Sequence, residues 1–166
     1  MALRIEVVSE VLPPGFDALR HQADVEGIRN VGMLVDRWRA GETGFDGPGE
    51  RLAVALLDGV LVGVGGVNAC PEVPDARRVR RFYVAPPARR HGVARALAEH
   101  LIAHASSHAD LLTCNAAASA AAPRFWEAMG FERAGDRFPG TRITHVAETL
   151  RRGAVRRGEP QGGSVT

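Results

Sequence analysis

The amino-acid sequence predicts one α+β domain, built on a mixed and mostly antiparallel sheet with helices on both faces. Two apolar runs joined by Asp58-Gly59 predict a β-hairpin, because Asp-Gly between β-rich segments is a strong hairpin signal. A strand–helix–strand passage between Val79 and Cys114 predicts a parallel strand pair with a right-handed crossover. The 166 residues are 45% hydrophobic and 24% charged, a balance that suits one globular core.

The first third of the chain predicts a strand and two helices. Leu3 to Val8 alternates apolar and polar residues, which is typical of a half-buried strand. Helical spacing begins at Phe16. An apolar stripe with helical period continues through Val31, Leu34, Val35 and Trp38. Because Gly27 and Gly32 weaken this stretch, we expect two short helices with a bend between them.

The hairpin follows a loop. Residues 41–49 hold four glycines and a proline, which predicts irregular structure. Leu52–Leu57 and Val60–Val67 are the two expected strands of the hairpin. Glycines are unusual inside a strand and indicate a bulge or the close approach of another group. In the second run they are Gly63, Gly65 and Gly66.

The rest of the chain completes the sheet. The expected elements are a strand (Val79–Val84), a helix (Gly92–Ala105), a short strand (Leu111–Cys114), a helix (Ala122–Met129, with Pro123 in its first turn and Gly130 as its cap) and two closing strands (Phe131–Ala134 and Ile143–Leu150). Residues 151–166 are polar and arginine-rich, so a disordered basic tail is predicted after a domain that spans residues 1–150.

Composition excludes several classes of function. A net charge of +2 does not indicate a general nucleic-acid interface, and no apolar run approaches the ~20 residues of a membrane span. The N-terminus lacks the basic start and long apolar stretch of a secretory signal, so a cytoplasmic protein is expected. The cysteines, Cys70 and Cys114, have no metal-type spacing and predict reduced, partly buried thiols.

The segment that carries chemistry is the loop Arg89 to Ala94 between a strand and a helix. The first N–H groups of a helix have no internal partner, and the helix dipole adds partial positive charge there. Gly92 and Ala94 lack bulk, so a phosphate can approach the backbone closely. The chain has no lysine and no GxGxxG, which excludes the P-loop and the Rossmann fingerprint.

This loop resembles the acetyl-CoA loop of the GNAT superfamily of N-acetyltransferases, whose signature is [Q/R]-x-x-G-x-[G/A]. Arg89, Gly92 and Ala94 occupy the three defining positions. Phe82 to Pro86 resembles the strand end that precedes the loop in that family. Ala122 to Phe131, APRFWEAMGF, resembles the family's A-x-x-F-Y-x-x-x-G-F segment.

The resemblance implies a site for acetyl-CoA, used as a co-substrate without a metal. The strands on either side of the crossover helix would splay apart, and the pantetheine arm would bond to the N–H groups of Phe82 and Val84. One such donor, assigned to Val84, would stabilise the oxyanion. The pyrophosphate would bind the amides of Arg90 to Ala94, and the acetyl group would pass directly to the amine. The expected cofactor-binding residues are Phe82, Tyr83, Val84, Arg89, Arg90, His91, Gly92, Val93, Ala94, Arg95, Asn115 and Trp126.

The chain departs from the family at Trp126, where a tyrosine often protonates the leaving thiolate. An indole N–H donates a hydrogen bond but is no practical acid. Tyr83, the single tyrosine of the chain, is a candidate substitute unless strand alternation points it into the core. Trp126 is expected either to pack beside the cofactor arm or to fill the core.

The residues that would bind the acceptor and remove its proton stay open. His145, Glu72 and Asp75 are candidate general bases, although each also suits a surface position. His100, His104 and His108 recur at helical spacing without a carboxylate or cysteine cluster, which favours a solvated helix edge over a metal site. Arg78 and Arg80, flanked by Arg77 and Arg81, either face an acceptor with a carboxylate or phosphate or form an exposed strand face.

The sequence therefore predicts an N-acetyltransferase that acts on the amine of a small molecule. Two alternatives remain: acetylation of a protein or peptide, and a catalytically weak acetyl-CoA sensor, which Trp126 motivates. The expected partners are acetyl-CoA and an amine, with neither nucleic acid nor membrane, and a homodimer is a candidate assembly because GNAT relatives often dimerise.

Overall fold

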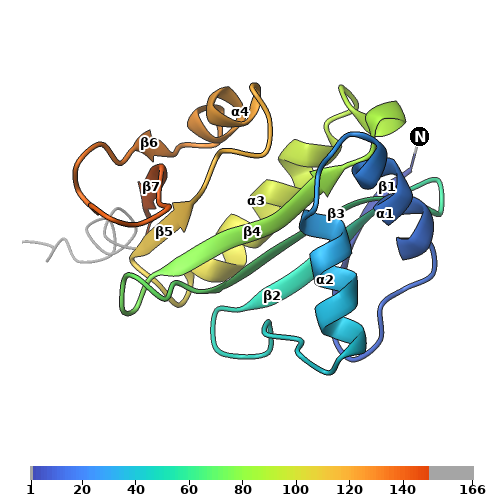
Figure 1. Ribbon diagram of the computed structural model, residues 1–166, viewed down its shortest axis with the longest axis horizontal. Coiled ribbons are helices and arrows are strands. Elements are labelled where there is room, and N and C mark those ends of the chain that lie inside the picture. The colour runs from blue at the N-terminus through green and yellow to red at the C-terminus, as the bar shows by residue number, and fades with distance from the viewer. Residues whose placement is uncertain (1, 150–166) are drawn as a thin grey trace, which may run out of the picture.

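The computed structural model describes residues 2–149, which form a seven-stranded sheet flanked by helices (Figure 1). In chain order the elements are β1 (Leu3–Val8), α1 (Phe16–Val25), α2 (Asn30–Arg39), β2 (Arg51–Leu57), β3 (Val60–Ala69), β4 (Arg77–Val84), the 3₁₀ helix η1 (Pro86–Ala88), α3 (Val93–Ser106), β5 (Leu111–Cys114), α4 (Ala122–Ala128), β6 (Glu132–Arg133) and β7 (His145–Glu148). The sheet order is β1-β2-β3-β4-β5-β7-β6. All neighbouring strands pair antiparallel except β4 and β5, which are parallel, and this confirms the predicted mixed α+β fold.

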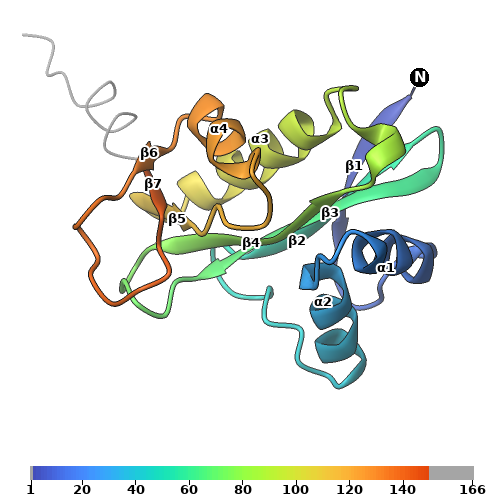
Figure 2. The same ribbon diagram turned by 45° about the horizontal axis from the view of Figure 1, so that its top comes forward.

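Helices cover both faces of the sheet (Figure 2). α1 and α2 pack on one face, where Leu19 and Val35 share a core with residues of β2 and β3. α3 and α4 lie on the other face, where Leu97, Leu101 and Trp126 form a second core. The central strands are therefore buried on both sides, and this rigid frame positions the loops at their ends.

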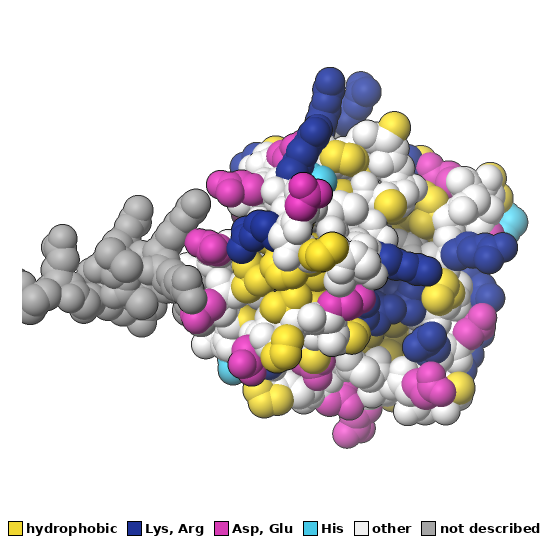
Figure 3. Space-filling model, turned by 60° about the vertical axis from the view of Figure 1, so that its left-hand side comes forward, with side chains coloured by type: hydrophobic (Ala, Val, Ile, Leu, Met, Phe, Trp, Pro, Cys, Tyr) yellow, Lys and Arg dark blue, Asp and Glu magenta, His cyan; other side chains and the backbone are white. Residues whose placement is uncertain are grey.

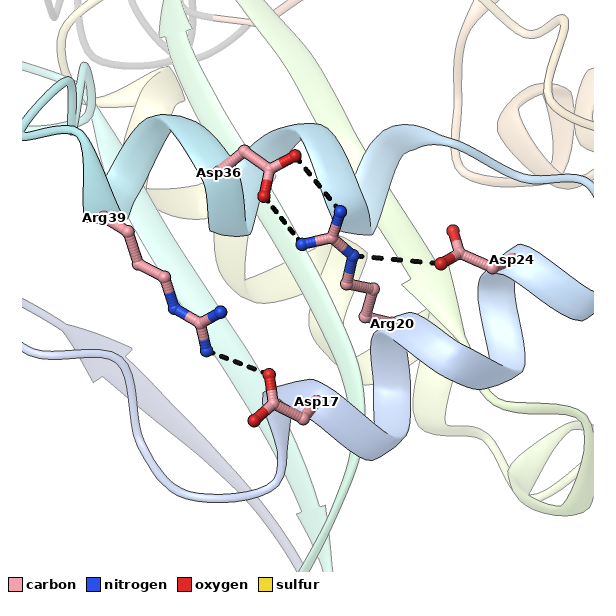
Figure 4. A network of polar contacts seen from close by, with 5 residues as sticks. All are labelled: Asp17, Arg20, Asp24, Asp36 and Arg39. Atoms are coloured by element: carbon pink, nitrogen blue, oxygen red, sulfur yellow. Dashed lines mark hydrogen bonds and ion pairs between the residues drawn. The ribbon is translucent and has the colours of Figure 1, made fainter.

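The two short N-terminal helices form as the glycine pattern predicts. Gly27 adopts a left-handed conformation (φ +74°) in the turn between them, where a residue with a Cβ would be strained. Ion pairs then hold the helices together (Figure 4): Arg20 Nη1 lies 2.7 Å from Asp36 Oδ1, and Arg39 Nη2 lies 2.9 Å from Asp17 Oδ1.

The glycines of β3 allow two distortions that the sequence indicated. A Cβ built on Gly65 would lie 2.7 Å from Cδ2 of Phe82, so the aromatic ring occupies the space of the missing side chain. The β3–β4 register also shifts between Val64 and Gly66. Arg81, on the partner strand at this shift, has a φ of +57°, which identifies a bulge in β4.

The closing strands are shorter than the sequence predicts. The N–H of Phe131 donates to the carbonyl of Trp126 and ends α4, so β6 begins only at Glu132. The N–H of Ile143 donates to Thr141 Oγ1, which keeps it out of the β7 ladder. Leu150 and the predicted basic tail, 151–166, lie outside the described residues. Within residues 2–149, every helix is too short or too polar to cross a membrane.

Candidate functional site

The parallel strands β4 and β5 separate after a short ladder (Figure 1). Their pairing joins only Arg77–Val79 of β4 to Leu112–Cys114 of β5. β5 ends at Cys114, whereas β4 continues through its bulge to Val84. The edge of β4 from Arg80 to Val84 therefore has no strand partner on the side of β5, and this confirms the expected splayed pair.

Backbone groups of Phe82 and Val84 point to this splayed edge. Successive residues of an extended strand direct their backbone groups to opposite edges. The N–H of Ala85 donates to the carbonyl of Val62 on β3 at 2.8 Å, so the groups of Val84 point away from β3. Two side chains bond to carbonyls there: Asn30 Nδ2 donates to Phe82 O (2.8 Å) and Arg89 Nε to Val84 O (3.1 Å). The matching N–H groups face the same edge.

Two cavities meet at this edge. The loop-side cavity has a volume of ≈ 290 Å³ and is mostly apolar; its walls include Tyr83, Val84, Arg89, Ala94 and Phe125. The arginine cavity has a volume of ≈ 370 Å³, and its walls include Arg78, Arg80, Asn115, Trp126 and Arg142. Both cavities share Phe82 and Ala118 as wall residues. The two cavities are therefore neighbours along the edge of β4.

The N-terminus of α3 adjoins the loop-side cavity and offers unpaired amides. Gly92 is its N-cap in a left-handed conformation (φ +74°), and no side chain caps the helix. The first helical bond runs from the N–H of Ala96 to the carbonyl of Gly92, so the preceding helical amides, Val93 to Arg95, have no partner within the helix. Arg90 is also left-handed (φ +66°), and such a loop forms a concave anion site.

Arg89, the first residue of the loop motif, is bound to a carboxylate of the protein. Its two Nη atoms lie 2.8 and 2.7 Å from the oxygens of Glu26, and the Tyr83 hydroxyl donates to the same carboxylate at 2.6 Å. These bonds lower the pKa of Glu26 and raise that of Arg89. Burial, together with the bond to Glu26, raises the pKa of Tyr83 well above its usual value. Arg89 therefore holds the loop against the end of α1, and the Tyr83 proton is committed to Glu26.

The arginine cavity carries a concentrated positive charge. Arg78, Arg80, Arg81 and Arg142 line it together with a single carboxylate, Glu72. Burial and the neighbouring guanidinium groups lower the pKa of Arg80 to about 10 and also lower that of Arg81. Figure 3 shows Arg side chains gathered around a hollow on this face. Arg77 lies outside the cavity wall and donates instead to the carbonyl of Pro48.

Trp126 serves as part of the core and as a wall of the arginine cavity at once. Its side chain is buried, and its ring packs edge-on against Phe82 (centroids 5.0 Å), Phe125 (4.9 Å) and Phe131 (5.3 Å). The aromatic cluster fixes Phe82, the residue at the junction of the two cavities. The indole thus shapes the place where the cavities meet.

Known proteins identify the family. The model of the acetyltransferase (GNAT) domain matches residues 24–150. The chain belongs to the GNAT acetyltransferase family. The activity of that family is acetyl-CoA-dependent acetyl transfer.

Solved structures agree with this membership. A candidate acetyltransferase from Exiguobacterium sp. 255-15 shares 26% sequence identity with a TM-score of 0.78, over 96% of this chain and 100% of that one. N-acetylglutamate synthase from Neisseria gonorrhoeae, complexed with coenzyme A and N-acetyl-glutamate, aligns with a TM-score of 0.65 at 18% identity, over 90% of this chain and 35% of that one. The ribosomal-protein-S18-alanine N-acetyltransferase from Escherichia coli gives 0.62 at 19% identity, over 89% and 94%. No curated protein shows a significant sequence match.

The three candidate general bases lie in different places in the structure. Glu72 lines the arginine cavity. Asp75 sits in an exposed turn with a φ of +67° and is absent from the cavity wall. His145 is buried on β7, with Nδ1 2.8 Å from Thr144 Oγ1 and Nε2 3.8 Å from Glu127. Only Glu72 of the three is therefore placed to meet a molecule in the cavity.

The histidines of α3 lie away from both cavities of the GNAT site. His100 contacts Arg51, and Nε2 of His104 lies 3.1 Å from the carbonyl of Glu50. Burial lowers the pKa of both histidines, which favours their neutral forms. In residues 2–149 no group of three His, Cys, Asp or Glu side chains is arranged to hold a metal ion.

Both cysteines are free and buried, as the sequence predicts. Cys114 lines the arginine cavity, and burial raises the pKa of its thiol to about 12. A thiol that stays protonated at neutral pH is a poor nucleophile. Cys114 therefore does not suit a covalent acetyl-enzyme intermediate.

Three residues of the site escaped the sequence analysis. Asn30, the first residue of α2, bonds to Phe82 across 52 positions of the chain. Glu26 pairs with Arg89 across 63 positions of the chain. Nothing in the sequence near Glu26 predicts this pair. Arg142 reaches the cavity from the loop before β7. No spacing rule links residues that far apart, so periodicity and motifs could not find them.

Proposed function

We propose that this GNAT enzyme transfers an acetyl group directly from acetyl-CoA to the amine of a small molecule. The observation that carries the proposal is the junction at Phe82, where a cavity beside free helix amides meets a second, polar cavity. A direct transfer needs such a junction, because both substrates must reach one point from different sides. The volume of the arginine cavity, ≈ 370 Å³, falls within the ~300–1,000 Å³ of small-molecule sites.

The loop-side residues fit acetyl-CoA. The amides of Gly92 to Ala94, aided by the exposed side chains of Arg90, His91 and Arg95, would hold the pyrophosphate. The splayed edge at Phe82 and Val84 would hold the pantetheine arm, with the apolar wall of the loop-side cavity beneath it. When bound, acetyl-CoA supplies an activated acetyl thioester. Val84 N–H would stabilise negative charge on the acetyl oxygen, and a donor of this kind is worth about 2.7–4 kcal/mol.

Glu72 is the proposed general base. An amine must lose a proton to attack, and Glu72 is the carboxylate that the structure places on the wall of the arginine cavity. Asn115 lies on the same wall and is available to orient the acceptor. We assign no acid role to Tyr83, since its hydroxyl proton is donated to Glu26.

Calorimetry with coenzyme A tests the donor half of this proposal. A Cβ on Gly92 meets no atom within 4 Å, and Asp and Asn both tolerate its left-handed backbone. Gly92→Asp places a negative charge where the pyrophosphate would bind, so its affinity for coenzyme A should fall about tenfold to a hundredfold. Gly92→Asn, the uncharged control of the same size, should stay within about fivefold of wild type.

Thiol release tests the reaction itself. The wild-type protein, incubated with acetyl-CoA and a panel of small amines, should release coenzyme A only when an acceptor is present. If Gly92→Asp and wild type bind coenzyme A with equal affinity, the pyrophosphate does not bind at this loop. Tight binding without thiol release, for small amines and N-terminal peptides alike, would favour the sensor alternative.

A further inference from the structure

We propose that the acceptor is a small amine that also carries an oxyanion, a carboxylate or a phosphate. This inference rests on the proposed function, because it takes the arginine cavity as the acceptor half of the site. It begins with the charge of the cavity wall. Four guanidinium groups and one carboxylate line the cavity, which leaves three positive charges without a balancing group on the wall.

The arginines of the cavity have no protein partner for their charge. Within residues 2–149, no carboxylate lies within 4.0 Å of a nitrogen of Arg78, Arg80, Arg81 or Arg142. Nε of Arg78 is buried and has no hydrogen-bond acceptor in that part of the chain. Arg81 Nη1 donates a weak hydrogen bond to the sulfur of Met33, at 3.6 Å. Within residues 2–149, the guanidinium groups of this cavity therefore have no carboxylate that balances their charge.

Elsewhere the same protein pairs several of its arginines with carboxylates. Arg20 and Arg39 bind aspartates between α1 and α2 (Figure 4), and Arg89 binds Glu26. A shortage of acidic residues does not explain the unpaired cavity, since the chain holds 19 acidic residues against 21 basic ones. Some exposed arginines, such as Arg90 and Arg124, also have no carboxylate partner within residues 2–149. Arg80 and Arg81 differ from them because they are half-buried, where a charge without a partner is costly.

Electrostatics favours an oxyanion as the missing partner. Arg80 is half-buried, and Arg81, Arg78 and Arg37 all act on it with charge of the same sign. A guanidinium fork matches the two oxygens of a carboxylate or phosphate with parallel hydrogen bonds. A polyamine or another multiply cationic acceptor would meet repulsion in the same place. The cavity therefore selects against such amines as well as for anionic ones.

The same wall offers acceptors for the amine. Oδ1 of Asn30 is buried and receives no hydrogen bond in residues 2–149, while its Nδ2 is fixed by Phe82. Glu72 adds a negative charge. Guanidinium donors and oxygen acceptors on one wall complement a molecule that combines an oxyanion with an N–H group.

The first experiment compares amines that carry an oxyanion with related amines that lack it. Wild-type enzyme with acetyl-CoA is assayed for thiol release with aspartate, its diamide, phosphoethanolamine, ethanolamine and putrescine. At least one anionic amine should show a kcat/KM about tenfold or more above its neutral counterpart, and putrescine should be the poorest acceptor. The faster of aspartate and phosphoethanolamine tells whether the oxyanion is carboxylate or phosphate.

Variants then assign the effect to the cavity. Arg78→Ala and Arg80→Ala should each raise the KM of the anionic acceptor about tenfold and leave the affinity for coenzyme A within twofold. Arg80→Lys keeps the charge and loses the fork, so its KM should lie between Arg80→Ala and wild type. Arg4→Ala on β1, at the far edge of the sheet, is the matched control and should match wild type.

The outcomes separate this inference from the function on which it rests. Turnover of ethanolamine or putrescine equal to that of the anionic amines would overturn the anionic acceptor and keep the acetyltransferase. If coenzyme A binds but no amine turns over, calorimetry of aspartate and phosphoethanolamine on the coenzyme A complex decides. Heat that disappears in Arg80→Ala supports the inference, and the absence of heat overturns it. If coenzyme A does not bind to the protein, the proposed function itself is contradicted.

Discussion

Arginine has opposite surroundings in the two cavities that meet at Phe82. In the loop-side cavity Arg89 binds both oxygens of Glu26 and also the carbonyl of Val84. In the arginine cavity Arg78 and Arg80 lack any carboxylate partner within residues 2–149. Arg89 holds in place a loop whose backbone amides can bind a ligand. Arg78 and Arg80 instead offer their side chains to a ligand.

This contrast shows two ways in which a protein builds an anion site. A paired guanidinium uses its hydrogen bonds within the protein. The backbone that it holds in place must then bind the ligand through its N–H groups. An unpaired guanidinium is costly for the fold and remains available for the ligand. Loss of the Arg89–Glu26 pair should therefore lower the stability of the fold, whereas loss of an unpaired arginine should weaken ligand binding and leave stability unchanged or higher.

The largest expected effect concerns Glu72, the carboxylate in the arginine cavity. If it accepts the proton of the amine, Glu72→Gln should lower kcat about 100-fold, because general bases typically contribute that much or more. The acidic limb of the pH–rate profile should disappear with the carboxylate, while the KM of acetyl-CoA should stay within twofold. Steady-state kinetics across pH measures both.

Asp75→Asn is the matched control for Glu72→Gln. Asp75 lies three positions further on in an exposed turn, and Asn tolerates its positive φ. It should retain wild-type kcat. An equal loss in both variants would mean that the turn matters for structure and that Glu72 is not the base.

Local patterns predicted most of the fold. Alternation, helical period and Asp58-Gly59 predicted the order of the elements from β1 to β5, and the glycines of β3 indicated the bulge that lies opposite them in β4. The closing strands were overestimated, because the bonds of Phe131 and Ile143 to nearby turns depend on geometry that period alone does not encode.

The site was predictable where a local motif or a run of like residues marks it, and not where packing alone joins its residues. The loop Arg89 to Ala94 was found because free amides at a helix start follow from local rules. The pairing of Arg89 with Glu26 was not, since it joins residues 63 positions apart that the packing of α1 on the sheet brings together. Motif matching listed Arg89 among the cofactor-binding residues, and in the structure its guanidinium binds a carboxylate and a carbonyl of the protein itself.

A second variant sharpens the contrast on the paired side. Glu26→Gln removes the charge that Arg89 binds and weakens the acceptor of the Tyr83 hydroxyl. The side chain of Glu26 is 27% exposed, so solvent screens the pair, and we expect the free energy of unfolding to fall by about 1–2 kcal/mol. Urea unfolding at neutral pH measures this. Glu132→Gln on exposed β6 should change stability by less than about 0.5 kcal/mol.

The same pair predicts a dependence on acidity. The bonds from Arg89 and Tyr83 lower the pKa of Glu26 below its ordinary value of 4.5. The unfolded chain then takes up the proton first, so the contribution of Glu26 is present above pH 4.5 and is lost as the pH falls through the folded-state pKa. Unfolding curves of wild type and Glu26→Gln should converge toward acidic pH. If the difference in free energy of unfolding between the two proteins stays constant with pH, the effect of Glu26→Gln does not come from the charge of Glu26.

The smallest expected effect has the opposite sign. Arg80 is half-buried among Arg37, Arg78 and Arg81, and burial with like charge lowers its pKa to about 10. Arg80→Ala removes that repulsion and breaks no ion pair within residues 2–149, so the free energy of unfolding should rise by about 0.5 kcal/mol even as acceptor binding weakens. The gain should shrink at high salt, because screening already reduces repulsion in the wild type. A loss of stability on the scale of Glu26→Gln would show that Arg80 has a structural partner, and the contrast between the two cavities would then fail.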